Sequence, residues 1–299
     1  RNVREQARAS FGSTPAIYED YRQLLDRKDI DAVIVGTPDH VRVYVCIHAC
    51  QAGKDIYAEK PLTLCIGEGR ALVRAVRKYQ RVFQVGSQQR SMAVNRIACE
   101  FIRSGKLGKI RVVQGVNYTG PRFPEELPEE EKPQDLDWDR WLNQAPARPY
   151  NKQLHYGWMA WWDYSGGQMT NLATHDIDRV QYVLKTPAPT TIYSAGGRMC
   201  LEDDGETPDV QDTIFTYPGF TLLYSFRETN GQSEGAGIRI FGTKGTATLG
   251  ESEYQILPDM KNDPVNLIPH FYGHPPGGPV FTDTKPVPWI QPSKVTTKE

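Results

Sequence analysis

Glu59, Lys60 and Pro61 stand together where an apolar run of the sequence ends. A lysine that is partly buried has its pKa lowered toward neutrality, while a neighbouring carboxylate raises that pKa again. Pro61 has no N–H and restricts the residue before it to an extended backbone, so Lys60 is kept out of a helix. The three residues predict either a positioned acid or hydrogen-bond donor, or a solvated ion pair at a turn.

A second group with chemistry lies in the stretch "GGQMTNLATHDIDRVQYVL". Asn171, His175 and Asp178 are spaced i, i+4, i+7, so on a helix they form one polar stripe. The roughly opposite side of that helix carries the apolar residues Ile177, Val180 and Leu184. On spacing alone, the stripe is a binding face or simply the solvated face of an amphipathic helix.

The first half of the chain alternates helix and strand patterns, which is typical of a parallel sheet with helices packed on it. The predicted strands cover residues 32–35, 55–61 and 81–87. The predicted helices cover residues 17–30, 41–54, 66–80 and 91–108. Asp39 is expected to cap the second of these helices and Gly53 to end it.

Each predicted strand leads into a polar segment. In an open parallel sheet, ligands bind outside the carboxyl ends of the strands. The three segments are Thr37-Pro38-Asp39-His40, Glu59-Lys60-Pro61 and Gly86-Ser87-Gln88-Gln89-Arg90. We therefore place Lys60 on the binding edge of the sheet.

The pattern changes after residue 118. Residues 119–166 are rich in Pro, Trp, Tyr and Glu with little periodicity, which predicts a long functional loop or lid. A helix is expected over 166–184, after another strand at 109–118. Further strands are predicted at 190–199, 211–218, 220–228, 236–242 and 246–251. Short turns between them indicate an antiparallel meander.

Composition excludes several classes of partner and site. A net charge of -1 and a pI near 6.7 provide no broad basic field for nucleic acid or a membrane surface. No stretch approaches the roughly 18 to 20 apolar residues that span a bilayer. The five cysteines form no C-x-x-C pair, and His270 and His274 lie in an expected loop, so no metal site is predicted.

The order of these segments resembles the Gfo/Idh/MocA family of NAD(P)-dependent sugar and polyol oxidoreductases. The resemblance covers nearly the whole chain. It is carried by "DAVIVGTPDHV", "AGKDIYAEKPLT", "VGSQQR", "IRSGKLGKIRVV", "LDWDRWLNQAPARPYN", "WWDYSGGQMTNLATHDID" and "IRIFGTKGT".

The resemblance implies a Rossmann domain that binds NAD or NADP and a C-terminal domain whose open sheet makes homo-oligomer contacts. A sugar or polyol substrate would bind between the domains, with Lys60 and His175 facing each other and handling the hydroxyl proton. The implied cofactor-binding residues are Thr37, Pro38, His40, Glu59, Lys60, Gln89 and Arg90. The implied substrate-binding residues are Asn171, Asp178, Trp162 and Tyr164, and for the two aromatic residues core packing is an open alternative.

The sequence departs from the family pattern at two points. Asn171 stands where many members have aspartate, and an asparagine can bind a sugar hydroxyl but cannot take its proton. No G-x-G-x-x-G occurs, so the phosphate-binding turn of a Rossmann fold is missing from this sequence. We therefore expect a fragment cut at both ends that binds dinucleotide weakly, or else a domain that never had the turn.

The predicted fold is thus α/β in two domains. Residues 1–115 would form a truncated Rossmann-type parallel sheet, and residues 116–299 an α+β domain with a mostly antiparallel open sheet. The segment "WDRWLNQAPARPYN" resembles a branch of the family that often carries a twin-arginine export signal, so a cytoplasmic or a periplasmic location is expected.

Two other functions stay open at this point. The family includes a glycosidase that keeps its dinucleotide bound and lacks the lysine of E-K-P, so the presence of Lys60 favours a dehydrogenase. A non-catalytic binding or assembly module without cofactor is the third candidate, and the missing glycine turn favours it.

Overall fold

The computed structural model describes residues 2–12, 15–118, 126–228, 236–250, 253–259, 288 and 290–296. The chain divides into two compact units, Arg1–Gly86 and Ser87–Glu299. The predicted boundary near residue 115 falls inside strand β4 (Ile110–Tyr118), downstream of this division. The assignment of domains 1–115 and 116–299 stays a prediction.

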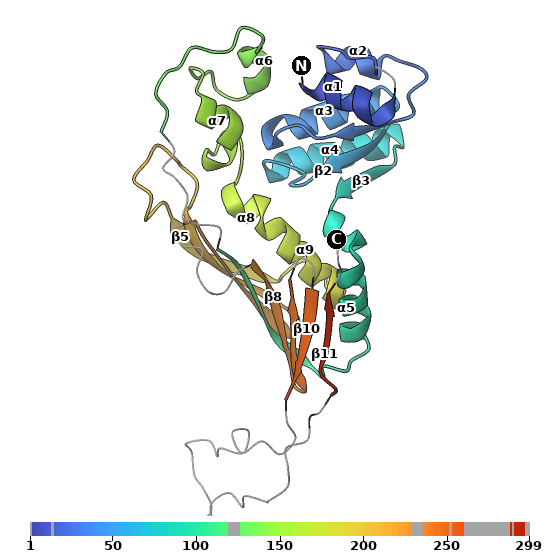
Figure 1. Cartoon of the computed structure of the whole chain (residues 1–299), viewed down its shortest axis with the longest axis vertical. Helices are drawn as coiled ribbons and strands as arrows, with labels where there is room; N and C mark the ends of the chain where they lie inside the picture. The colour runs from blue at the N-terminus through green and yellow to red at the C-terminus, as the bar shows by residue number, and fades with distance from the viewer. Residues whose placement is uncertain are drawn as a thin grey trace, which may run out of the picture. The chain divides into compact units, whose positions relative to one another are not determined.

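The described strands of the first unit form a parallel sheet in the order β1-β2-β3, as predicted (Figure 1). Its strands are β1 (Ala32–Val35), β2 (Asp55–Glu59) and β3 (Phe83–Gly86). Its helices are α1 (Asn2–Phe11), α2 (Tyr21–Leu25), α3 (Asp39–Gln51) and α4 (Ile66–Tyr79). Alternate strand residues such as Val35, Ile56 and Ala58 are buried in one core with α3 and α4. This packing aligns the strand ends that carry the candidate residues.

The ends of these helices differ from the prediction in two places. Asp39 is the first residue of α3 and Pro38 is its N-cap, and the Asp39 carboxylate pairs with Arg42 in the same helical turn. The helix expected over 17–30 is only the short α2, which Asp20 caps by accepting the Arg22 N–H. Gly53 follows α3 with a φ of 75°, as its predicted role at the helix end requires.

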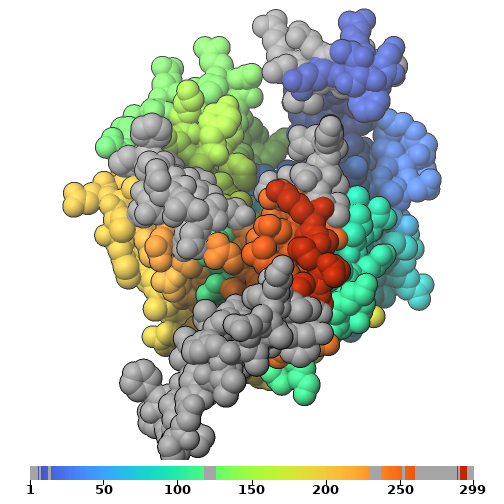
Figure 2. All heavy atoms as spheres, turned by 60° about the horizontal axis from the view of Figure 1, so that its bottom comes forward, coloured from blue at the N-terminus to red at the C-terminus, as the bar shows by residue number. Residues whose placement is uncertain are grey.

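In the described part of the second unit, the strands form one mixed sheet in the order β11-β10-β9-β8-β4-β7-β6-β5. All its neighbouring strands are antiparallel except β4 and β7, so the predicted mostly antiparallel sheet is confirmed. The strands after β4 are β5 (Thr191–Gly197), β6 (Val210–Tyr217), β7 (Phe220–Arg227), β8 (Ala236–Gly242), β9 (Gly245–Leu249), β10 (Glu253–Pro258) and β11 (Ser293–Thr296). The sequence did not predict β10 and β11, and Figure 2 shows β11 in red at the surface of this unit.

Helices α5 (Ala93–Arg103) and α9 (Ala173–Leu184) pack on one face of this sheet and share its hydrophobic core. The helix predicted over 166–184 is divided into α8 (Gly167–Asn171) and α9, with Leu172 between them. Gly167 has a φ of 68°, and a Cβ there would lie 2.9 Å from the Cβ of Thr207. The start of α8 is therefore set by a close approach that requires glycine.

The segment predicted as a loop over 119–166 has ordered structure of its own. Within its described part, from residue 126, it contains α6 (Trp138–Leu142) and α7 (Lys152–Gly157). Their side chains form a separate aromatic cluster, which we define by its buried members Trp138, Leu142, Tyr150, Leu154, Ala160, Trp161 and Tyr164. Low sequence periodicity here thus reflects short helices packed by aromatic side chains.

Across the described residues, no helix is both long and apolar enough to cross a lipid bilayer. His270 and His274 lie outside the described residues.

Candidate functional site

The candidate residues of the first unit lie at the carboxyl ends of its parallel strands. Thr37 lies two residues beyond the end of β1, Glu59 is the last residue of β2, and Lys60 follows it directly. Two hydrogen bonds from the Arg42 guanidinium, to the carbonyl oxygens of Thr37 and Pro61, join these two strand-end segments. The structure therefore brings together two of the three segments that the sequence placed on the binding edge.

Lys60 is half-buried, and burial lowers the pKa of its ammonium from the ordinary value of 10.5. Nearby charges act in both directions: Asp39 raises this pKa, Arg42 lowers it, and Glu59 raises it. A lowered pKa increases the fraction of neutral amine available to accept a proton. The environment of Lys60 is thus suited to proton transfer.

Asp39 and Arg42 form a buried ion pair that the sequence analysis did not identify. Their side chains are 5% and 4% exposed, and Arg42 Nη2 lies 3.2 Å from Asp39 Oδ1. Opposite charges at i and i+3 were the available signal, but such pairs are usually solvated. Only the burial of this helical turn distinguishes the pair from an ordinary surface one.

The other candidates of the first unit differ in their accessibility. The Thr37 hydroxyl oxygen is buried and has no hydrogen-bond partner among the described residues, so a bound polar ligand could supply one. Thr37 as a whole is half-buried, whereas the whole of His40 is buried. Gly86 lies against Glu59, since a Cβ there would come within 3.0 Å of a Glu59 carboxylate oxygen. The residues present fit a ligand with hydroxyl groups at this edge.

In the second unit, the predicted polar stripe is interrupted. Asn171 is the last residue of α8, whereas His175 and Asp178 belong to α9. The three residues are therefore divided between two helices and not on the single predicted one, although Leu172 between them keeps a right-handed helical backbone. All three side chains are half-buried, and Asn171 Nδ2 lies 2.6 Å from the sulfur of Met159.

Two predicted site residues of the second unit form an ion pair with each other. Arg90 donates from Nε and Nη2 to the two carboxylate oxygens of Asp178, at 2.8 and 2.5 Å. Its guanidinium also lies 5.2 Å from the centre of the Tyr182 ring. The neighbouring Gln89 is buried, and its backbone carbonyl oxygen accepts a hydrogen bond from the Asn95 side chain. Both Arg90 and Asp178 thus have partners within this unit.

The two aromatic candidates have opposite surroundings. Trp162 is 53% exposed, so its ring is accessible to a ligand. Tyr164 has no exposed surface and lies in the aromatic cluster, 5.3 Å from the Trp141 ring. Of the two roles that the sequence left open for Tyr164, these surroundings support core packing. Arg148 pairs with Asp163 and Glu206, so it anchors this segment.

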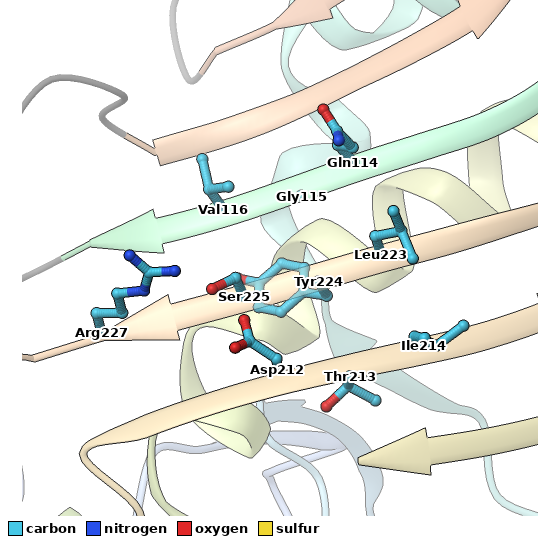
Figure 3. Close-up of a pocket in the computed structure, with 10 residues that line it drawn as sticks. All are labelled: Gln114, Gly115, Val116, Asp212, Thr213, Ile214, Leu223, Tyr224, Ser225 and Arg227. Atoms are coloured by element: carbon cyan, nitrogen blue, oxygen red, sulfur yellow. The ribbon is translucent and has the colours of Figure 1, made fainter. Parts of the chain in front are cut away.

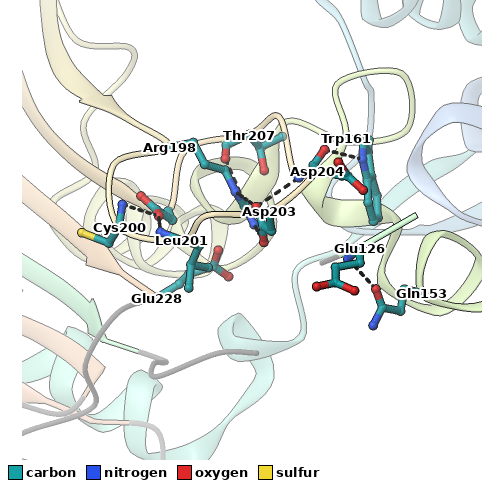
Figure 4. A network of polar contacts seen from close by, with 12 residues as sticks. Glu126, Gln153, Trp161, Arg198, Cys200, Leu201, Asp203, Asp204, Thr207 and Glu228 are labelled. Carbon is teal, nitrogen blue, oxygen red and sulfur yellow. Dashed lines mark hydrogen bonds and ion pairs between the residues drawn. The ribbon is translucent and has the colours of Figure 1, made fainter. Parts of the chain in front are cut away.

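Polar networks that the sequence analysis missed hold the connection between β5 and β6 (Figure 4). Asp209 accepts the backbone N–H groups of Met199, Cys200 and Leu201 at 2.7 to 2.9 Å. Arg198 donates to both carboxylate oxygens of Asp203. These carboxylates already have several partners each, so we assign this connection a structural role.

A second buried cluster lies between α9 and the sheet. Asp176 pairs with Arg179 one helical turn later, and the Tyr224 hydroxyl donates to Asp176 at 2.9 Å. Arg179 also donates to the carbonyl oxygen of Gly250 at 2.8 Å. This cluster fixes the first turn of α9, which carries His175.

Comparison with protein families agrees with this architecture. A family model described as "Oxidoreductase family, NAD-binding Rossmann fold" matches residues 1–87. The model for the C-terminal alpha/beta domain of the same oxidoreductase family matches residues 110–194. The chain belongs to the Gfo/Idh/MocA family.

Two curated relatives of this family member are named as dehydrogenases of levoglucosan and of scyllo-inositol. Levoglucosan dehydrogenase of Pseudarthrobacter phenanthrenivorans is 26% identical over 248 residues, covering 76% of this chain and 57% of the relative. The scyllo-inositol 2-dehydrogenase (NAD(+)) of Bacillus subtilis is 26% identical over 259 residues, covering 85% of this chain and 65% of the relative. The chain thus spans less than two thirds of the length of either relative.

Solved structures of two dehydrogenases share the fold of this Gfo/Idh/MocA member. A levoglucosan dehydrogenase in complex with NADH and levoglucosan has a TM-score of 0.65 at 20% identity, covering 86% of this chain and 64% of that chain. The WlbA dehydrogenase of Bordetella pertussis, in complex with NADH and UDP-GlcNAcA, has a TM-score of 0.62 at 20% identity, covering 83% of this chain and 67% of that chain. At this identity the likeness establishes the fold.

Proposed function

We propose that the protein is an oxidoreductase that transfers a hydride between NAD(P) and a hydroxyl or carbonyl group of a sugar, polyol or related compound. The observation that carries the proposal is Lys60, a half-buried lysine with a lowered pKa at the carboxyl end of a parallel strand. The family membership and the names of the relatives support the same reaction class.

Residues at the strand ends are proposed to hold the cofactor. When bound, the nicotinamide ring supplies or accepts the hydride. The Thr37 hydroxyl and the Glu59 carboxylate are suited to bind hydroxyl groups, and Pro38 and His40 belong to the same segment. Gln89 and Arg90, from the segment after β3, complete the proposed set. A family model named for NAD binding makes NAD the first cofactor to test.

Lys60 and His175 are proposed to handle the substrate proton. In the direction of oxidation, a neutral Lys60 amine takes the hydroxyl proton as the carbon–hydrogen bond breaks, and in reduction its ammonium returns that proton. The imidazole of His175 can both donate and accept a proton, so it is suited to share this step. The prediction that the two groups face each other joins the two units and stays a prediction.

The substrate-binding role is proposed for Asn171, Asp178 and Trp162. An amide binds sugar hydroxyls as both donor and acceptor, and an exposed indole ring packs against the apolar face of a sugar. Both oxygens of the Asp178 carboxylate accept from Arg90, so Asp178 would bind substrate as part of this ion pair. Because Tyr164 is fully buried, we propose that it supports this region by packing.

The test uses the product of the complete reading frame with NAD and NADP and a panel of sugars and polyols. We expect Lys60→Ala to lower turnover by about 10²-fold or more, since that is the usual contribution of a positioned acid or base. The matched control is Lys78→Ala, which removes an exposed lysine of the same unit and should leave turnover unchanged. Near-normal turnover in Lys60→Ala would remove Lys60 from the mechanism.

The names of the reported relatives favour a dehydrogenase over the glycosidase alternative. If the protein is instead a non-catalytic module, no compound of the panel should be oxidised or reduced under any of these conditions.

We also propose that the outer face of the large sheet, opposite α9, binds a second copy of this chain. A hollow of about 350 Å³ lies on this face. It is lined by residues of β4, β6 and β7, which Figure 3 draws as sticks. Ile214 and Leu223 are adjacent across β6 and β7 and are 41% and 37% exposed. Apolar side chains gathered on a wide sheet face are typical of an interface.

The oligomeric state tests this second proposal by sedimentation. Ile214→Asp should shift the protein to a smaller mass, because it would bury a charge in the interface. Ile97→Asp is the matched control, since Ile97 is also 41% exposed but lies on α5, on the other side of the sheet. An unchanged mass for Ile214→Asp, or an equal loss of mass in both variants, would contradict an interface at this face.

A further inference from the structure

A buried arginine connects the two strand-end segments of the first unit. Arg42 lies in the first turn of α3, the helix that joins β1 to β2. Its Nη1 donates to the carbonyl oxygen of Pro61, and its Nη2 donates to the carbonyl oxygen of Thr37 and pairs with Asp39. One guanidinium therefore contacts the chain just beyond each of two adjacent strands.

The planar guanidinium is the group that suits this task. It presents several N–H donors in a rigid fork, so it can hold two carbonyl oxygens and a carboxylate at once. A lysine at the same position would bring one compact ammonium and could not reproduce the fork. The burial of Arg42 and Asp39 removes the competition of water for these contacts.

The same ion pair also surrounds Lys60 with opposing charges. The charged groups that act on Lys60 are Asp39 and Arg42 from α3 and Glu59 from β2. Pro61, whose carbonyl oxygen Arg42 holds, directly follows Lys60 in the chain. Arg42 is therefore linked to Lys60 by the backbone and by charge.

We propose that Arg42 is a positioning residue for Lys60, holding together the segments that follow β1 and β2 and, with Asp39, setting the charge around the Lys60 amine. The inference rests on the proposed function, in which Lys60 carries the substrate proton. It adds a residue of the first unit that acts on the reaction through Lys60.

The direct test is the titration of Lys60 in the complete protein without cofactor. Lysines are dimethylated with isotope-labelled formaldehyde, the Lys60 signal is assigned as the one missing in Lys60→Arg, and its chemical shift is followed against pH by NMR. Arg42→Gln removes a positive charge and should raise the pKa of Lys60, whereas Asp39→Asn removes a negative charge and should lower it. The expected result is therefore a higher Lys60 pKa in Arg42→Gln and a lower Lys60 pKa in Asp39→Asn.

A merely structural role gives a different result. If the pair only kept this part of the fold closed, either variant would admit water and raise the pKa of Lys60 toward its ordinary value. A rise in both variants, or no change in either, would overturn the proposal. If one single variant fails to fold, the double variant Asp39→Asn/Arg42→Gln replaces it, because it leaves no unpaired buried charge. The pKa of Lys60 in the double variant should lie closer to its value in the unchanged protein than the pKa of Lys60 in the remaining single variant does.

Arg42→Lys separates the fork from the charge. It keeps the positive charge, so the pKa of Lys60 should stay low, but it cannot hold both carbonyl oxygens, so turnover should fall without an increase in KM. Full activity in Arg42→Lys would overturn the positioning role. The two proposals fail separately, because the titration shifts do not depend on activity, whereas normal turnover in Lys60→Ala would overturn the function alone.

Discussion

Each unit of this protein contains a buried Asp–Arg pair near the start of a helix, and the two pairs have different surroundings. Asp39 and Arg42 lie in the first turn of α3 in the first unit, whereas in the second unit Asp176 ends the first turn of α9 and Arg179 follows one turn later. Both arginines also donate to backbone carbonyl oxygens of other segments. The motif and the burial are therefore nearly the same.

The difference lies in the third group that each pair contacts or acts on. Asp176 accepts a hydrogen bond from the Tyr224 hydroxyl, and burial together with the nearby Asp176 raises the pKa of that hydroxyl, so it stays neutral. The charges of Asp39 and Arg42 instead act on Lys60, whose pKa is lowered by burial. The same pair thus supports a scaffold in one unit and modifies a titratable amine in the other.

The largest effect is expected from removing the scaffold pair. Arg179→Met leaves Asp176 as an uncompensated buried charge, and breaking a buried pair costs about 3–5 kcal/mol in the free energy of unfolding. Urea unfolding followed by tryptophan fluorescence measures the loss, since all six tryptophans follow residue 86.

The matched control is Arg140→Met, which breaks an Asp–Arg pair of the same i, i+3 spacing. Arg140 and Asp137 are 51% and 59% exposed, so their pair should contribute only about 0–1 kcal/mol. Equal losses in the two variants would show that burial does not distinguish them. Arg179→Met should also leave the titration of Lys60 unchanged, in contrast to Arg42→Gln.

A smaller effect is expected from displacing the tyrosine that completes the scaffold cluster. A Cβ at Gly115 would lie 2.5 Å from Cδ2 of Tyr224, so Gly115→Ala must move the ring that donates to Asp176. Overpacking of this kind costs about 1–3 kcal/mol in the free energy of unfolding. Urea unfolding by tryptophan fluorescence again measures it.

Gly197→Ala is the control for this change. A Cβ there would meet only the flexible Met199 side chain, at 3.5 Å, so the effect should stay within about 0.5 kcal/mol. If Gly115→Ala is as stable as this control, the position of the Tyr224 ring does not matter to the cluster.

The smallest effect concerns His155, whose pKa is shifted by burial alone. Burial next to the Trp138 and Trp141 rings lowers the pKa of His155 below 6.5. As the pH falls, the unfolded chain therefore takes up this proton before the folded chain does. The contribution of neutral His155 to the free energy of unfolding is fully present above pH 6.5 and decreases as the pH falls below that value. One proton limits the slope to about 1.4 kcal/mol per pH unit.

Thermal unfolding on both sides of pH 6.5, read by tryptophan fluorescence, should show this slope, and His155→Phe should reduce it. The same substitution at His48 is the control. Burial lowers the pKa of His48 too, but His48 lies in the first unit, which contains no tryptophan, so this slope should not change. An unchanged slope in His155→Phe would mean that other groups control the pH dependence.

Periodicity and strand-end chemistry predicted much of the first unit. The apolar run Ala32–Val35 is β1 with the same bounds, and Lys60 lies directly after β2 as expected. These features depend on neighbours in sequence, so local patterns detect them. The division of the helix at Leu172 was missed because no glycine or proline marks it in the sequence.

By itself, the sequence determined the alternation of strands and helices, the family and the candidate amine at residue 60. Only the tertiary structure decided that Arg42 and Asp39 are buried, that Arg90 pairs with Asp178, and that Tyr164 packs inside an aromatic cluster. The reason is physical: hydrophobic patterning follows from the residues on one element, whereas burial and charge pairing depend on which elements meet.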